Sequence, residues 1–243
     1  KINDSKTEVI IFGTKYIISH INNDEIKIKI GDYKIVSSTS VRNLGVIYDQ
    51  ILSMDLHVQS VCKTANWQLR NLWKIRKYLT DKATKSLVHA FISSGLDYGN
   101  ALLYGVSKSL IDQMQRIQNN AARVISKMSR FEHITETRKD LHWLPIEQRI
   151  KYKLLMYVFK CLHNAAPIYL TELVEKYKPT YNLRSIDQCF LVEPKTYSVY
   201  GDHAFSAAGP HLWNNLPLEM RQIESLNDFK RNLKTFLFCQ AYN

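Results

Sequence analysis

The sequence predicts an α+β fold, in which a short antiparallel β-hairpin region at the N-terminus is followed by mainly helical structure. Within the first 50 residues, apolar and polar side chains alternate at the period of half-buried strands. From about residue 60 onward, apolar residues recur at three- and four-residue spacing, as in helices that face a core. The chain has 243 residues and 45% hydrophobic content, which suffices for one large domain or two to three small ones.

The N-terminal region is predicted to form short strands and no helix. Ile26, Ile28 and Ile30 alternate with lysines, and Gly31-Asp32 marks a turn to a partner strand. A sheet this small needs another element packed on its apolar face. The candidate strands are residues 9–12, 16–18, 26–30, 33–36 and 41–48, the last of them interrupted by Gly45.

Three helices are predicted between about residues 60 and 130. The second of them begins at Thr80 or Asp81 and ends near Gly95. The third is capped by Ser109, with Asp112 at the reciprocal position of a capping box. Their core-facing residues are expected to be Val61, Ala65, Leu69, Leu72, Ile75 and Leu79 in the first helix, Leu87, Ala90 and Phe91 in the second, and Leu110, Met114, Ile117, Ala121, Ile125 and Met128 in the third.

Two further helices are predicted after residue 143. One begins near Pro145 and ends before Pro167, and the other is capped by Ser225 and Asp228. Between them, residues 176–204 are rich in Tyr, Pro and polar groups and are expected to be loop-like. The inward-facing residues are expected to be Ile150, Leu154, Tyr157, Val158 and Cys161 in the first helix, and Phe229, Leu233, Phe236 and Leu237 in the second.

Catalytic motifs are absent from the sequence. It contains no GxSxG, HExxH or GxGxxG, no Gly-rich phosphate loop, and no close pair of acidic residues of the kind that a two-metal site needs. Asp97 is interpreted as a turn or helix-exit residue, and His142 and His211 as core or turn residues. The sequence therefore predicts no catalytic site, no metal site and no cofactor.

The cysteines and the hydropathy indicate an intracellular protein of the cytoplasm or nucleus. Cys62, Cys161, Cys189 and Cys239 have neither zinc-ligand spacing nor the density of a disulfide framework, so we expect reduced thiols packed as small hydrophobic side chains. The first residues lack the pattern of a secretory signal. No apolar run approaches the roughly 20 residues that span a bilayer, and we expect no membrane association.

The positive charge is concentrated in the middle of the chain. The net charge is +11, and residues 51–160, with 18 Lys and Arg against 8 Asp and Glu, account for +10 of it. Two of the predicted helices each carry four cations opposite the apolar stripe, with the same spacing of seven, four and three residues. The two sets are Lys63, Arg70, Lys74 and Lys77, and Arg116, Arg123, Lys127 and Arg130.

Such strips bind phosphates in some proteins and are merely solvated in others. Their matched spacing and the localised charge favour a polyanion, because Lys and Arg contact phosphates without reading base identity. Trp67 and Trp73 flank the first strip, one on each side. These two side chains either stack on bases or sugars or pack at a helix interface.

Seven segments, taken in order along the chain, resemble one protein family. They are "INDSKTEVIIFGT", "VRNLGVIYDQILSMDLHV", "FISSGLDYGNALLYG", "MQRIQNNAARVI", "HWLPIEQRIKYKLLMYVFKCLH", "GDHAFSAAGPHLWNNLPLEMR" and "LNDFKRNLKTFLF". Together they are similar to the C-terminal part of the reverse transcriptase of non-LTR (LINE-type) retrotransposons, and the resemblance covers essentially the whole length.

This resemblance implies a division of the chain and a parent activity. Residues 1–58 would be the remainder of the palm, 59–143 a basic helical thumb, and 144–243 a C-terminal extension with the loop-rich segment 176–204. The parent enzyme is an RNA-directed DNA polymerase whose palm aspartates hold two Mg²⁺ ions, and the resemblance places those aspartates upstream of this sequence. Lys6 matches the family's palm lysine, which is discussed as a proton donor, although a lysine at a strand start is also commonly just solvated.

We therefore expect a fragment that is inactive as a polymerase and that grips nucleic acid. Its expected partners are RNA or an RNA/DNA primer–template, together with the upstream palm and fingers. An alternative is an element-derived interaction or scaffold module whose basic face meets an acidic protein. A role at a membrane surface is disfavoured, because the apolar stripes are needed for the core. The expected contact residues are Lys63, Arg70, Lys74, Lys77, Arg116, Arg123, Lys127, Arg130, Trp67 and Trp73.

Overall fold

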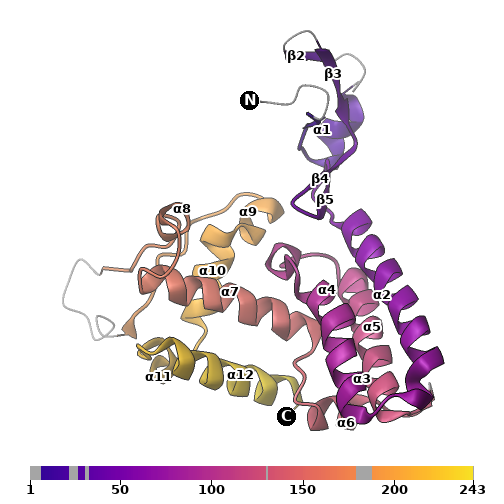
Figure 1. Ribbon diagram of the computed structural model, residues 1–243. Helices are drawn as coiled ribbons and strands as arrows, with labels where there is room; N and C mark the ends of the chain where they lie inside the picture. Colours follow the sequence, from indigo (N-terminus) through magenta and orange to yellow (C-terminus); the bar gives the residue numbers. More distant parts are fainter. Residues whose placement is uncertain (1–6, 22–26, 31–32, 130, 179–187, 243) are drawn as a thin grey trace.

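The predicted α+β class is confirmed by a computed structural model, which describes residues 7–21, 27–30, 33–129, 131–178 and 188–242. The protein is mostly helical, with two small sheets near the N-terminus. In Figure 1 the sheets lie apart from the helical body and join it at the start of α2 (Asp55–Ile75). Lys6 and Arg130 lie outside the described residues.

The N-terminal region contains the predicted hairpin and also a helix that the sequence did not predict. Strands β2 and β3 pair antiparallel, with Lys27 opposite Val36, and β1 adds to β3 in parallel, so that the three-stranded sheet is mixed. The predicted strand at residues 16–18 is wrong: this segment is helical, and Thr14 Oγ1 caps it by accepting from the Ile17 amide at 3.3 Å. The elements are β1 Val9–Ile10, α1 Lys15–His20, β2 Lys27–Ile30 and β3 Tyr33–Ser38.

A second hairpin links the sheets to the helical body. Strands β4 (Ser40–Asn43) and β5 (Val46–Asp49) pair antiparallel around Leu44 and Gly45, both with positive φ. The predicted strand at 41–48 is therefore two strands and a tight turn. After β5, the Asp49 carboxylate accepts from the amides of Ser53 at 2.9 Å and Met54 at 2.8 Å. These bonds organise the turn that starts α2 several residues before the predicted position.

His57 fastens this hairpin to α2. The side chain is buried, and its Nδ1 accepts from the Ile47 amide at 3.5 Å. Burial, helped by the positive charge of Arg42, lowers the pKa of His57 from its ordinary 6.5. A protonated ring would lose the acceptor and place a charge in an apolar setting.

We therefore expect the protein to lose stability as the pH falls below about 6.5, where the unfolded chain takes up a proton on His57 more readily than the folded one. Stability from this group is fully present above that pH and declines toward the lowered folded pKa. Urea unfolding at pH 7.5 and 5.5 measures the loss. In His57→Asn, which keeps an acceptor but does not titrate, the loss should be smaller. Equal losses in the two proteins would contradict this role.

The first helical layer consists of α2, α3, α5 and the short segments between them. The five-residue segment His89–Ser93 is a π-helical turn, and the buried residues in and around it are Thr84, Val88, Ile92, Ser93 and Leu96. The predicted inward positions Ala90 and Phe91 are exposed, because apolar residues occupy adjoining faces here and packing selects one of them. The elements are α2, the 3₁₀ turn η2 Arg76–Tyr78, α3 Asp81–Val88, the π turn η3 His89–Ser93, α4 Ser94–Asp97, the 3₁₀ turn η4 Asn100–Leu103, α5 Lys108–Ser126 and α6 Thr135–Asp140.

The α5 helix has the predicted apolar stripe but a different cap. Leu110, Met114, Ile117, Ala121 and Ile125 are all buried. The N-cap is Ser107 rather than Ser109, and its hydroxyl makes no capping bond to the helix. It instead lies 3.0 Å from the Ser109 hydroxyl, within the first turn.

The second helical layer is built on α7, and its helices α8 to α11 were not predicted. Helices α10 and α12 pack on α7 (Figure 1). Ile146, Ile150 and Leu154 of α7 belong to the core of the first layer, whereas Leu155 and Phe159 belong to that of the second. One helix thus supplies both cores. The elements are α7 Ile146–Leu162, α8 Ile168–Thr171, α9 Val199–His203, α10 Phe205–Asn214, α11 Leu218–Arg221 and α12 Leu226–Tyr242.

Polar side chains also tie the two layers together. Gln118 of α5 donates to the Leu144 carbonyl at 2.9 Å, and Gln115 accepts from the Ile146 amide at 3.0 Å. Arg149 of α7 donates to both carboxylate oxygens of Asp97, at 2.7 and 2.8 Å, so the predicted helix-exit residue Asp97 is also an ion-pair partner. Across the described ranges, no helix has both the length and the apolar character to cross a bilayer.

Candidate nucleic-acid interface

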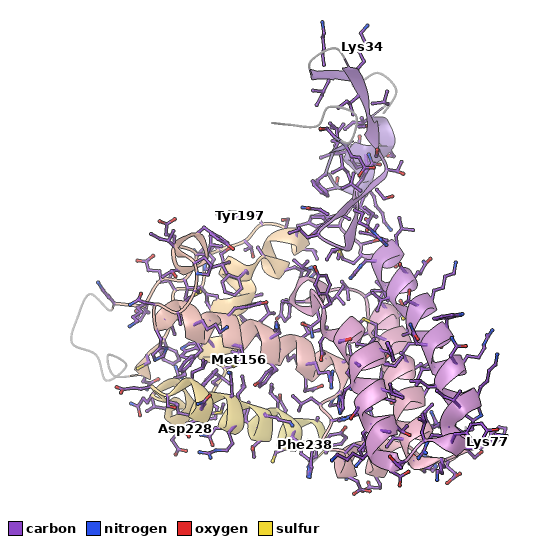
Figure 2. All side chains as sticks on the ribbon, viewed as in Figure 1. Lys34, Lys77, Met156, Tyr197, Asp228 and Phe238 are labelled. Atoms are coloured by element: carbon purple, nitrogen blue, oxygen red, sulfur yellow. The ribbon has the colours of Figure 1, made fainter. Side chains whose placement is uncertain are left out.

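The outer face of α2 and its following turn carries a row of exposed cations, here called the α2 basic face. It comprises Lys63, Arg70, Lys74 and Lys77, all exposed. At about 100° and 1.5 Å per residue, they share one side of the helix over roughly 20 Å. Figure 2 shows nitrogen-tipped side chains projecting from the outer edge of α2, with Lys77 at the end farthest from the sheets.

Acidic side chains are missing along this whole segment. Between Asp55 and Asp81 the sequence contains five Lys or Arg residues and no Asp or Glu. Among the described residues, no ion pair involves a member of the α2 basic face. Most surface helices mix both signs of charge, which neutralises their field. The four cations here are instead free to attract an external anion.

Aromatic rings stand among these cations. The side chains of Trp67 and Trp73 are 60% and 52% exposed, so packing at a helix interface does not account for them. Tyr78, which the sequence analysis missed, is 77% exposed, and the Lys77 ammonium lies 4.8 Å from the centre of its ring. Its position four residues after Lys74 in the sequence is the signal that could have identified it, and in the structure it lies in the 3₁₀ turn η2.

The second predicted strip, on α5, is only partly available. Arg116 is exposed and lies near Cys62 of α2: burial raises the pKa of the Cys62 thiol, and the Arg116 charge acts in the opposite direction. Arg123 is half-buried and donates to the carbonyls of Ser129 at 3.3 Å and Glu132 at 3.2 Å. Lys127 is exposed and is the C-cap of α5, with a φ of 57°. Arg116 and Lys127 therefore remain open to solvent, while Arg123 holds the following loop.

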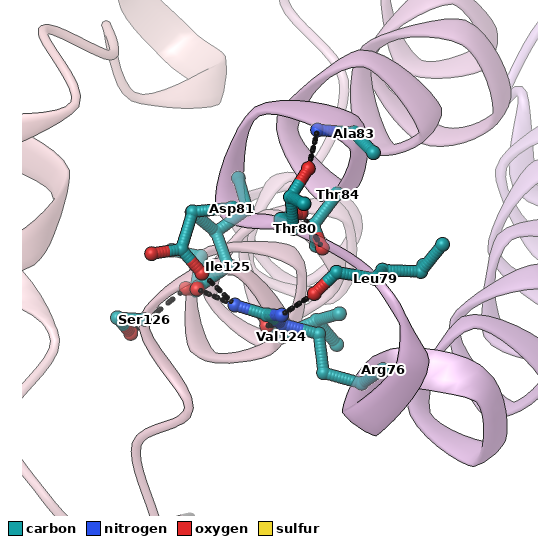
Figure 3. A network of polar contacts seen from close by, with 10 residues as sticks. Arg76, Leu79, Thr80, Asp81, Ala83, Thr84, Val124, Ile125 and Ser126 are labelled. Atoms are coloured by element: carbon teal, nitrogen blue, oxygen red, sulfur yellow. Dashed lines mark hydrogen bonds and ion pairs between the residues drawn. The ribbon is translucent and has the colours of Figure 1, made fainter.

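Arg76 positions the end of the basic face. It is 4% exposed, and its guanidinium donates to the carbonyls of Val124 at 2.8 Å, Ile125 at 2.9 Å and Leu79 at 2.9 Å (Figure 3). These bonds join the C-terminal ends of α2 and α5. A hydrogen bond from Arg76, with the charge of Lys127, lowers the pKa of Asp81 at the start of α3. Sequence periodicity gave no sign that this cation, alone among its neighbours, points inward.

Other regions of the chain are weaker candidates for a functional site. Two cavities, of about 660 and 440 Å³, lie around α7 and not on the α2 basic face. Within the part of the chain that the structure describes, no three His, Cys, Asp or Glu side chains group as metal ligands. Cys62 and Cys161 are buried as predicted, but Cys189 and Cys239 are exposed, which corrects the expectation that all four pack as hydrophobic side chains.

Comparison with protein-family models, with curated proteins and with solved structures returns no match to this chain.

Proposed function

We propose that the protein binds nucleic acid through the α2 basic face, with Arg116 and Lys127 of α5 extending the positive field. The observation that carries this proposal is an exposed helical face of roughly 20 Å whose four cations have no ion-pair partner among the described residues and whose sequence contains no acidic residue. A phosphate backbone presents regularly spaced charges of the opposite sign. The four cations repel one another, and their binding to a polyanion is favourable because they displace its condensed counterions.

The resemblance to non-LTR reverse transcriptases makes RNA, or an RNA/DNA primer–template, the proposed ligand. In that reading the first helical layer acts as a thumb that grips the strand. Among the described residues, no three His, Cys, Asp or Glu side chains group as metal ligands, and the sequence contains none of the catalytic motifs sought. We therefore assign no step of nucleotide addition to this chain, and its proposed contribution is binding.

A protein-interaction module is the second candidate, and the N-terminal region favours it. Phe12, Tyr16, Ile17, Ile28 and Val36 are between 41% and 74% exposed, which leaves an apolar surface around the sheets. A protein partner, such as the palm and fingers that the resemblance implies, would cover this surface. If the protein acts as a scaffold, the α2 basic face would bind a second partner, an acidic protein.

Charge reversal on the α2 basic face tests the first proposal. We expect Arg70→Glu with Lys74→Glu to weaken binding of a 20-nucleotide RNA about tenfold or more at low salt, because two attractions become repulsions. The slope of log affinity against log salt is negative, and its magnitude should decrease by about 1 for each of the two substituted residues. Fluorescence anisotropy at 50 to 200 mM salt measures both quantities.

The matched control is Lys230→Glu with Lys234→Glu, which makes the same type of charge change at the same spacing on the exposed side of α12. This control should retain most of the affinity. An unchanged salt slope in the Arg70/Lys74 variant would reject the proposed interface. Unchanged RNA binding together with loss of an acidic protein partner would favour the scaffold function.

A further inference from the structure

The α2 basic face interleaves its cations with exposed aromatic rings. Lys63, Trp67, Arg70 and Lys74 follow one another at steps of three or four residues, which places them on one row of the α2 surface, and Tyr78 lies in the 3₁₀ turn η2 that continues the helix. Trp73 lies at the side of the row. A row built only to attract phosphates would not need rings, and surface tryptophans that remain more than half exposed leave a large apolar area in water.

We propose that this face takes single-stranded nucleic acid, with bases stacked on Trp67, Tyr78 and Trp73 and phosphates on the neighbouring cations; the inference rests on the proposed binding function and narrows its ligand. Trp67 and Tyr78 are 11 positions apart, which corresponds to about 16 Å along a helix. Roughly five stacked bases span that distance at 3.4 Å each.

The chemistry of the rings separates a single strand from a duplex. In a duplex the faces of the bases are covered by their neighbours, and the outer surface offers mainly sugar and phosphate. In a single strand every base has a free π-face, so stacking on aromatic side chains is sequence-tolerant. Exposed Trp and Tyr side chains beside Lys and Arg are the combination that single-strand binding proteins use.

An apolar protein partner fits this face less well. Covering the rings with an apolar surface would also bury Lys63, Arg70 and Lys74, for which the described residues provide no counter-charge. Burying unpaired charges carries a large desolvation penalty. A strand of nucleic acid supplies a phosphate for each cation and a base for each ring, and it leaves the remaining surface wet.

The four tryptophans make the test direct. Trp143 and Trp213 are 5% and 1% exposed, so a ligand at the surface should quench mainly Trp67 and Trp73. Three probes of equal length are titrated into the full chain: a 12-nucleotide RNA, a 12-base-pair RNA/DNA duplex, and a 12-nucleotide abasic strand that keeps the phosphates. We expect strong quenching and the tightest binding with the RNA strand alone.

The matching variant is Trp67→Leu with Trp73→Leu, and the control is Tyr197→Leu, which removes a 97% exposed ring far from α2 in sequence. Each lost stacking contact should weaken binding of the RNA strand by about tenfold. Binding of the duplex and the abasic strand should change by less than about threefold, and the control should bind as the parent does. Circular dichroism checks that the helices are retained.

Equal affinity for RNA strand, abasic strand and duplex, unchanged by the Trp variant, would overturn the single-strand inference. The proposed binding function would survive that result if Arg70→Glu with Lys74→Glu still abolished binding. Failure of both variants to affect any probe would remove both proposals. Loss of RNA-strand binding in the Trp variant alone, with duplex binding intact, supports the inference.

Discussion

Replacing Arg76 with methionine is expected to lower the free energy of unfolding by about 3–5 kcal/mol. The arginine donates to three carbonyls, of which those of Val124 and Ile125 belong to the last turn of α5. Carbonyls at a helix end have no partner within the helix, so they depend on an outside donor. Methionine fills a similar volume but donates nothing, and these carbonyls would remain buried without a donor.

The matched control is Arg70→Met, six residues earlier on the exposed side of α2, where the change in stability should stay within about 0.5 kcal/mol. Urea unfolding followed by circular dichroism measures both variants. Equal, small changes in the two would show that the Arg76 bonds contribute little. Since Lys77 and Tyr78 follow Arg76 directly, loosening this turn should also misplace one end of the α2 basic face.

Replacing Phe229 with alanine is the second change with a large expected effect, again about 3–5 kcal/mol. Phe229 of α12 is fully buried, and its ring stacks on Phe159 of α7 with the ring centres 4.3 Å apart. Its centre also lies 5.7 Å from that of Trp213 in α10. Truncation would leave a cavity where the three helices of the second layer meet.

The neighbouring Lys230→Ala serves as the control, because its side chain is exposed and the change should stay within about 0.5 kcal/mol. Thermal unfolding measures both variants. Because α7 supplies both cores, we expect the loss to appear as one earlier transition of the whole helical body. A separate early transition of the second layer, with the first layer unchanged, would contradict that coupling.

The turn after α2 contributes both to the stability of the fold and to the proposed binding face. The buried guanidinium of Arg76 joins the ends of two helices (Figure 3). Lys74 and Lys77, on either side of it in the sequence, are exposed. Basic residues that are close together in the sequence thus have opposite roles. A charge count assigns both to the surface, and only the acceptors around Arg76 separate them.

Most of the candidate interface could be predicted from the sequence because it depends on one local period. Ala65, Leu69 and Leu72 of the predicted α2 stripe are buried, whereas Ile75, also predicted to face the core, is 45% exposed. The buried side of the helix places Lys63, Arg70, Lys74 and Lys77 on the opposite side. The same reasoning predicted the stripe of α5 and the buried Phe229, Leu233 and Leu237 of α12, and Pro145, the N-cap of α7, marked the start of that helix. Long amphipathic helices carry their orientation in their own residues.

The predictions that failed concern residues whose conformation depends on partners that are distant in the sequence. Arg123 has the spacing of a surface cation, yet carbonyls of the following loop hold it. Helix α10 escaped detection because it contains Pro210 and is apolar on several faces, and its packing on α7 decides its conformation. The short α3–α4 segment has apolar residues on two adjoining faces. Packing against the neighbouring helices determines which of the two faces is buried.

By itself, the sequence determined a basic helical body with a small β region, and it placed a row of cations on the outer side of one helix. The tertiary structure decided which of the cations remain free, that Trp67, Trp73 and Tyr78 stand exposed among them, and that Arg76 turns inward. The physical reason is the range of the interactions. Helix period acts over a few residues, whereas the donors, acceptors and packed surfaces that settle each side chain come from elements that only folding brings together.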